Sequence, residues 1–156
     1  EDPGRAATSQ PAVPRPLETV VRWWPGPRAD WFTPESVLAL FDAEWRVTDT
    51  SRVGVRLAGP ELGRRVHREL ASEGLVEGAM QVPPDGRPIV MLADHPTTGG
   101  YPVIAVADPR DLHVLAQAGA GTVLRFRRAT VAAWSAASTA WRTSTASRAP
   151  SAASDD

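Results

Sequence analysis

The sequence contains no cysteine and no lysine, and it has only three histidines. Without cysteine the chain forms no disulfide, offers no thiol nucleophile and holds no zinc through thiolates. Without lysine it has neither a Schiff-base nucleophile nor the point charge that often binds phosphate. The histidines His67, His95 and His113 lie at no short spacing from one another. We therefore expect no metal site.

Charge and hydropathy exclude further classes of function. The formal net charge of −1 predicts no binding to nucleic acid or to an anionic membrane surface. No apolar run approaches the roughly 20 residues of a membrane-spanning helix. The first residues, Glu1–Gly4, lack the basic start of a signal peptide. We expect a cytoplasmic location and, because residue 1 is not Met, a start inside a longer gene product.

Composition divides the chain into three parts. Residues 1–16 contain four prolines and predict a linker. Residues 17–128 predict one compact domain. The Ala/Ser-rich tail, residues 129–156, is expected to be partly helical and then disordered. In this tail Val131, Trp134, Ser138 and Trp141 share one stripe of a helix, which suits packing on the domain or on a partner.

Short apolar segments between turn signals predict a mainly β fold. The expected strands are residues 18–24, 44–48, 53–58, 78–82, 89–93, 101–107 and 122–127. Alternation places Val53, Val55 and Leu57 on one face of their strand, against the core. Segments 89–93 and 101–107 are apolar on both faces, which is typical of strands covered on both sides.

Two helix starts complete the architecture. Thr33 is a good N-cap with a proline after it, and Val37, Leu38 and Phe41 then form an apolar face. A second start, residues 108–111, resembles a capping box with a proline in its first turn. These elements predict a closed or nearly closed β-barrel with two or three short helices over its ends.

The segment from Asp94 to Tyr101 is the densest in reactive residue types. It places an acid, a histidine, two threonines and two glycines between buried strands. Such a loop can turn backbone N–H groups inward and bind a carboxylate, a phosphate or an oxyanion. It can equally be a glycine-rich turn capped by its own side chains. His95 is either a general base or a loop histidine bonded to Asp94 or Thr97.

Other polar residues also allow two interpretations. Gln81 lies in an apolar strand, on the face opposite Met80 and Val82, so its amide binds either a substrate amide or a loop backbone. Arg52 and Arg56 form either an anion site or a solvated face. The sequence has no P-loop, no dinucleotide-binding glycine motif, no H-E-x-x-H and no G-x-S-x-G. A partner would therefore have to supply any nucleotide or biotin site.

Several blocks together resemble one family, that of allophanate hydrolase subunit 2, the C subunit of 5-oxoprolinase and the biotin-dependent carboxyltransferase region of urea carboxylase. They are residues 22–27 (RWWPGP), 30–33 (DWFT), 51–60 (SRVGVRLAGP), 72–74 (SEG), 78–88 (GAMQVPPDGRP) and 94–102 (DHPTTGGYP). The match spans roughly residues 19–127 and corresponds to the C-terminal half of the family's domain. The resemblance implies that the N-terminal half of that domain lies outside this sequence. Many members carry Asn or Asp at the position of Ser51. Many carry Lys at the position of Val103.

The resemblance implies a cyclophilin-like β-barrel and a place in a larger enzyme. The first hypothesis is a component of an ATP-dependent 5-oxoprolinase. The second is carboxyl transfer from biotin to a urea-like nitrogen, and the third is a non-catalytic regulatory module that binds a subunit-1 homologue. ATP or biotin is expected through the complex, with a subunit-1-type partner and a third, catalytic subunit. By position the implied site residues are Arg52, Gln81, Asp94, Thr97, Thr98, Gly99, Gly100 and Tyr101, and residue type adds His95.

Overall fold

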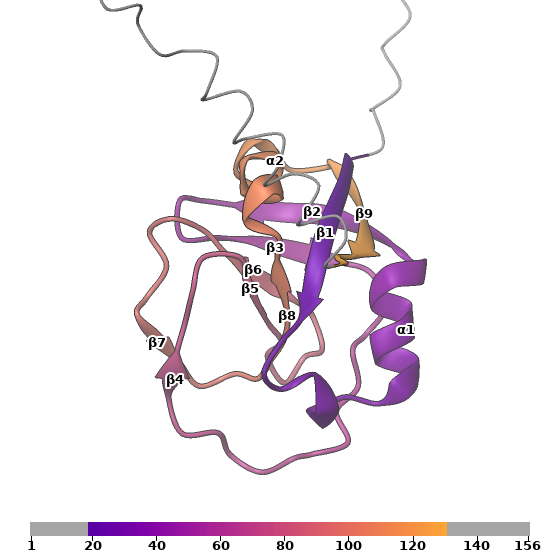
Figure 1. Cartoon of the computed structure of the whole chain (residues 1–156), viewed down its shortest axis with the longest axis vertical. Coiled ribbons are helices and arrows are strands. Elements are labelled where there is room, and N and C mark those ends of the chain that lie inside the picture. The colour runs from indigo at the N-terminus through magenta and orange to yellow at the C-terminus, as the bar shows by residue number, and fades with distance from the viewer. Residues whose placement is uncertain (1–18, 131–156) are drawn as a thin grey trace, which may run out of the picture.

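Nine strands, two α-helices and two 3₁₀ turns make up the computed structural model, which describes residues 19–130 (Figure 1). The strands are β1 (Thr19–Pro25), β2 (Glu44–Thr50), β3 (Gly54–Ala58), β4 (Glu73–Gly74), β5 (Ala79–Gln81), β6 (Ile89–Met91), β7 (Thr98–Gly99), β8 (Val103–Ala107) and β9 (Val123–Arg128). The α-helices are α1 (Pro34–Asp42) and α2 (Leu112–Gln117), and the 3₁₀ turns are η1 (Ala29–Trp31) and η2 (Pro109–Asp111).

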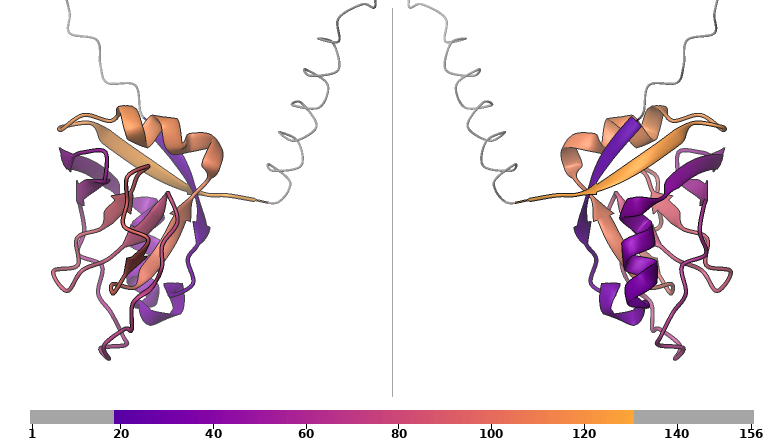
Figure 2. Two further views of the ribbon diagram at one scale, coloured as in Figure 1. Left: turned by 90° about the vertical axis from the view of Figure 1, so that its left-hand side faces the viewer. Right: turned by 90° about the vertical axis from the view of Figure 1, so that its right-hand side faces the viewer.

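Seven strands close into a barrel in the order β1-β8-β5-β6-β3-β2-β9. Closure comes from β1, which pairs antiparallel with β8 on one side and parallel with β9 on the other. The predicted mainly β barrel with short helices is confirmed. The two helices lie on different sides of it (Figure 2). Neither described helix has the length and apolar character needed to cross a membrane.

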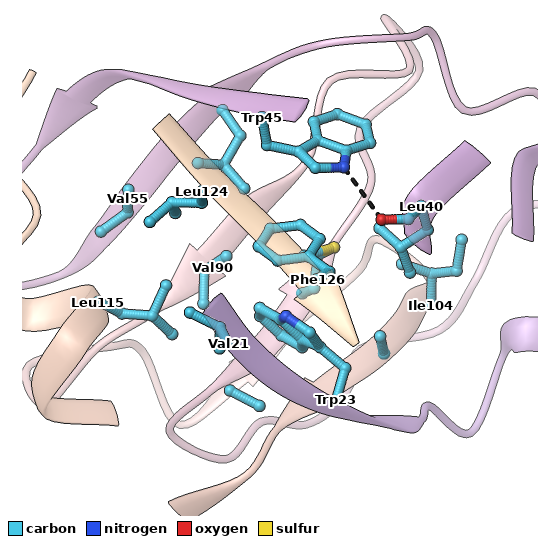
Figure 3. Packing of buried hydrophobic residues seen from close by; sticks show 14 of the residues in the cluster. Val21, Trp23, Leu40, Trp45, Val55, Val90, Ile104, Leu115, Leu124 and Phe126 are labelled. Atoms are coloured by element: carbon cyan, nitrogen blue, oxygen red, sulfur yellow. Dashed lines mark hydrogen bonds between the residues drawn. The ribbon is translucent and has the colours of Figure 1, made fainter. Parts of the chain in front are cut away.

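Aromatic rings fill the inside of the barrel (Figure 3). Trp23, Trp45 and Phe126 are at most 2% exposed. The Phe126 ring meets Trp23 edge-on at 5.0 Å and lies nearly parallel to Trp45 at 5.9 Å. The Trp45 indole N–H donates to the carbonyl of Leu40 in α1, at 3.1 Å. This bond and ring packing hold α1 against the barrel.

A second apolar cluster covers the outer face of β5, β6 and β8. It consists of Leu75, Ala79, Met91 and Val103, with Ile89 and Val106 partly buried beside them. Because Met80, Val90 and Ile104 of the same strands face the inner core, these strands are covered on both sides, as was predicted for segments 89–93 and 101–107. The small sheet of β4 and β7, which the sequence pattern did not predict, lies outside the barrel (Figure 1). Leu75 of the cluster directly follows β4.

Two details of the predicted core are wrong. Val53 precedes β3 and is 48% exposed, because the strand starts only at Gly54, although Val55 and Leu57 are buried as expected. Leu38 is 63% exposed, and Leu40 takes the buried position of α1. The start of α1 is as predicted, since the Thr33 hydroxyl accepts from the Ser36 N–H at 3.2 Å. The predicted linker and the helical stripe of the tail lie outside the described residues.

Candidate functional site

The loop after β6 crosses the outside of the barrel and separates the predicted site residues into two groups. The Asp94 group, Arg52, Asp94 and His95, lies past the end of β6. The Gln81 group, Gln81 with Thr97 to Tyr101, lies where β5 pairs with the start of β6 and β8. The structure therefore brings together the members of each group but not the two groups with each other.

Arg52 and Asp94 form a forked ion pair. The Arg52 Nε donates to Asp94 Oδ2 at 2.5 Å and its Nη2 donates to Oδ1 at 3.2 Å. The Asp94 backbone N–H also donates to the Arg52 carbonyl at 3.0 Å, which fixes the two loops to each other. The hydrogen bond from Arg52 lowers the pKa of Asp94 below its ordinary value. Asp94 is therefore ionised at neutral pH and acts as a hydrogen-bond acceptor. Its partner Arg52 is exposed, with 83% of its side chain accessible.

His95 makes neither of the two bonds expected for a loop histidine. Its Nδ1 lies 2.8 Å from the Pro96 carbonyl, and its backbone N–H donates to the Leu92 carbonyl at 3.0 Å. If Nδ1 carries the proton and donates to that carbonyl, Nε2 is left as the acceptor. This orientation is compatible with binding a proton at Nε2.

A surface hollow of about 460 Å³ lies beside the Asp94 group. It is lined by Thr50, Ser51, Arg52, Glu77, Leu92, Ala93 and Ala116. Asp94 occupies the Nε side of the Arg52 guanidinium, and the described residues place no hydrogen-bond partner on its Nη1. The guanidinium therefore retains N–H groups that could donate hydrogen bonds to a small anion in the hollow.

Gln81 lies buried beneath β7. Its side chain points outward from β5, opposite Met80 and Val82, as expected, and the residue is 5% exposed. The side-chain amide donates to the Tyr101 carbonyl at 3.0 Å. A Cβ added to Gly99 would lie only 2.5 Å from the Gln81 Nε2. Glycine does allow a close approach at this loop, and the group that approaches is the Gln81 amide.

The rest of the loop is held as a short strand. Thr98 and Gly99 pair with Gly74 and Glu73, and the Thr97 carbonyl accepts from the Leu75 N–H at 2.9 Å. Tyr101 is 45% exposed. The Tyr101 carbonyl accepts a hydrogen bond from the buried Gln81 side chain, whereas the phenol remains accessible at the surface.

Two arginines near the Gln81 group were not found from the sequence. Arg28 forms an ion pair with Glu73 of β4, and Arg64 donates to the Val82 carbonyl next to Gln81. Burial lowers the pKa of Arg64. No local pattern identifies these residues, because each contact joins segments that are distant in sequence. Within residues 19–130, no three acidic or histidine side chains gather closely enough to hold a metal ion.

Comparison with known proteins assigns the family. The carboxyltransferase domain, subdomain A and B, matches residues 1–128. The chain belongs to the carboxyltransferase-domain family. It is 42% identical over 107 residues to the 5-oxoprolinase C subunit of Escherichia coli, covering 68% of this chain and 34% of that protein. It is 37% identical over 115 residues to the 5-oxoprolinase C subunit of Haemophilus influenzae, covering 73% and 37%.

Structural comparison agrees on the fold of this carboxyltransferase-family chain. The crystal structure of Kluyveromyces lactis urea carboxylase matches with a TM-score of 0.64 and 24% identity, over 72% of this chain and 11% of that one. The chain spans about a third of the length of the curated relatives that it matches.

The Thr97–Gly100 segment does not fit the phosphates of ATP. The glycine segment that could have cradled an anion is paired with β4, and the Gln81 side chain fills the space over Gly99. The carboxylate of Glu73 lies in the same small sheet, in an ion pair with Arg28. An anionic ligand would meet a carboxylate there, with no lysine in the chain to compensate.

We expect Gly99→Ala to lower the free energy of unfolding by about 1–3 kcal/mol, the usual range for overpacking. The added methyl group would contact Gln81 Nε2 at 2.5 Å and Leu75 Cδ1 at 2.9 Å. The matched control is Gly100→Ala, because its Cβ would have no neighbour nearer than 3.7 Å. Urea denaturation of both variants measures the difference. Equal stability of the two would contradict the packing of Gln81 against Gly99.

Proposed function

We propose that this chain acts as a C-subunit-type component of an ATP-dependent 5-oxoprolinase, which opens 5-oxoproline to glutamate. The observation that carries the proposal is the 42% identity to a 5-oxoprolinase C subunit. The second curated relative has the same name and is 37% identical. The matched regions cover 34% and 37% of those two proteins, so the chain is proposed to supply part of the activity.

The Asp94 group is the proposed reactive part of the chain. Opening a lactam places negative charge on the amide oxygen, and the free donors of Arg52 would stabilise that charge. Asp94 is held by the same guanidinium and its lowered pKa keeps it ionised. It would therefore accept a hydrogen bond from the attacking water and orient it. His95 would accept a proton at Nε2.

The Gln81 group is proposed to support the loop. Gln81 was expected to bind the lactam amide of the substrate, and that role stays a prediction. Its observed bond to the Tyr101 carbonyl favours a positioning role, because a buried amide with a backbone partner holds the loop in place. The expected contact of Thr97, Thr98 and Gly100 with the substrate likewise stays a prediction.

Partners and cofactor are proposed from the relatives, which are named as subunits of a larger enzyme. The Thr97–Gly100 segment, which was the expected anion cradle, is closed by β4 and Gln81, so we propose that ATP binds to a partner chain. A subunit-1-type homologue and a third, catalytic subunit are the proposed partners, in a cytoplasmic complex.

Co-expression with the partner subunits tests the proposal. We expect ATP-dependent glutamate release from 5-oxoproline, and we expect Asp94→Ala combined with Gln81→Ala to reduce it by about tenfold or more, the scale of lost acid–base and positioning contributions. The exposed variant Arg56→Ala, on the neighbouring strand, is the matched control and should keep full activity. Full activity in the double variant would remove the roles given to these residues.

Carboxyl transfer from biotin is the second candidate, and the fold shared with urea carboxylase favours it. It predicts that the chain accelerates the decay of carboxybiotin only when urea or another amide is added. If the chain instead binds a subunit-1 homologue and the complex shows neither reaction, a non-catalytic binding module is the remaining explanation.

A further inference from the structure

The guanidinium of Arg64 is partly buried and has no carboxylate partner among residues 19–130. Every other described arginine that is partly buried forms an ion pair with an acidic residue, and these arginines are Arg22, Arg28, Arg110 and Arg125. A charge that is removed from water is normally paired, because an unpaired one loses its hydration without compensation. Arg64 therefore lacks the counter-ion that its surroundings call for.

The electrostatics of Arg64 agree with its hydrogen bonds. Burial lowers the pKa of Arg64, and no carboxylate of the described residues acts in the opposite direction. Glu73, the acidic residue of the small sheet, is paired with Arg28 and contributes nothing at Arg64. Among the described residues, the titratable side chain that would act on this charge is the Tyr101 phenol, once ionised, which places the phenol near the guanidinium.

Arg64 uses one of its nitrogen atoms to hold the end of a barrel strand. Its Nη2 donates to the carbonyl of Val82, which directly follows β5. Its Nε is buried without a hydrogen-bond partner, and Nη1 donates to no described residue. Because Nη1, unlike Nε, is not fully enclosed, it is the nitrogen that can donate to a ligand from solvent.

Tyr101 offers a second donor beside this guanidinium. The residue is 45% exposed, and its backbone is fixed because its carbonyl accepts from the buried Gln81 side chain. At the preceding residue, Gly100, an added Cβ would have no neighbour nearer than the Leu70 carbonyl at 3.7 Å. The segment that carries Arg64 therefore passes close to this turn without crowding it.

We propose that the Arg64 guanidinium and the Tyr101 phenol form a binding site for the carboxylate group of a small molecule. One positive charge matches the single negative charge of a carboxylate, and two donors match its two oxygen atoms. A phosphate group carries up to two charges and three free oxygen atoms, and it would find too few donors here because Arg28 is already paired and the chain has no lysine. The site is separate from the Asp94 group and does not depend on the proposed reaction.

Tyr101 is the only tyrosine in the sequence, so its phenol can report on this site alone. The full-length chain is produced with 3-fluorotyrosine, and its single fluorine resonance is followed at about pH 6.5, where the phenol is protonated. Acetate replaces chloride at constant ionic strength, which keeps the screening of charges unchanged. We expect a saturable shift of the resonance, and we expect Arg64→Gln to weaken acetate binding about tenfold or more, the scale for losing a hydrogen bond from a charged donor.

Two further variants separate binding from a structural role of Arg64. Arg64→Gln keeps an amide that can donate to the Val82 carbonyl, and Arg64→Lys keeps the charge, so the lysine variant should bind acetate more tightly than the glutamine variant. The matched control is Arg65→Gln, because Arg65 is exposed and its Nε donates to the Asp30 carbonyl. This control should bind acetate as the native chain does.

Three results would overturn the proposal: no saturable shift in the native chain, an equal shift in Arg64→Gln, or tighter binding of inorganic phosphate than of acetate. The titration needs neither ATP nor partner subunits. Its failure is therefore independent of whether the complex releases glutamate.

Discussion

Replacing Trp45 with alanine should lower the free energy of unfolding by about 3–5 kcal/mol, the range for removing a buried tryptophan or phenylalanine. Trp45 is fully buried, and its ring packs against Phe126 on one side. On another side it contacts Gly59, where an added Cβ would lie 2.5 Å from the ring. Gly59 has no side chain that could move into the space left by the indole, so the variant leaves a cavity.

The variant Trp45→Phe separates packing from hydrogen bonding. It keeps an aromatic ring against Phe126 but leaves the Leu40 carbonyl without the indole donor found at 3.1 Å. An unsatisfied buried acceptor costs about 1–3 kcal/mol, so this variant should lie between the native chain and Trp45→Ala. Urea denaturation with tryptophan-independent detection by circular dichroism measures all three. A loss below about 1 kcal/mol for Trp45→Ala would contradict the inner position of the ring.

Local patterns predicted the barrel strands because a strand buried on one face is apolar at every second residue, whereas a strand buried on both faces is apolar throughout. The 89–93 and 101–107 segments are examples, since their uninterrupted apolar runs correspond to two separate clusters. The same reasoning failed at Leu38, where the apolar positions of α1 allow two different stripes. Only the packing of α1 against β9 and Trp45 selects Leu40.

The candidate site was less predictable than the barrel. Gln81 was correctly predicted to face away from Met80 and Val82, because this orientation depends only on strand alternation. The pairing of Glu73–Gly74 with Thr98–Gly99 involves two residues from each segment, too few for any periodicity. The fork between Arg52 and Asp94 joins residues 42 positions apart and depends on the barrel having formed.

Asp108 directly follows β8 and forms an ion pair with Arg110. The carboxylate of this pair is buried, whereas the guanidinium is partly exposed. Its carboxylate has no exposed surface, and it accepts from the Arg110 Nε at 2.8 Å and from the Arg110 backbone N–H at 3.0 Å. The hydrogen bond from the Arg110 side chain, which outweighs the opposing effect of burial, lowers the pKa of Asp108 to about 2. The neighbouring pair of Arg22 and Asp111 joins the same turn to β1.

This lowered pKa predicts how stability depends on pH. In the unfolded chain Asp108 titrates near its ordinary value of 3.8, so the folded state binds fewer protons between that value and about 2. The contribution is therefore complete above about pH 4–5 and is lost as pH falls toward 2, and it amounts to about 2 kcal/mol. Denaturant titrations between pH 7 and pH 2 measure it, and Asp108→Asn should remove this part of the pH dependence.

Removing the cation should have the larger effect. In Arg110→Met the carboxylate of Asp108 stays fully buried without its charged partner, and breaking such a pair costs about 3–5 kcal/mol. Burial then raises the pKa of Asp108, so the loss of stability should decrease as pH falls and the group protonates. The double variant Asp108→Asn, Arg110→Met should be more stable at pH 7 than Arg110→Met alone, because it leaves no uncompensated buried charge. If the two single changes were simply additive at pH 7, the two side chains would not be coupled and the ion pair would not anchor the turn after β8.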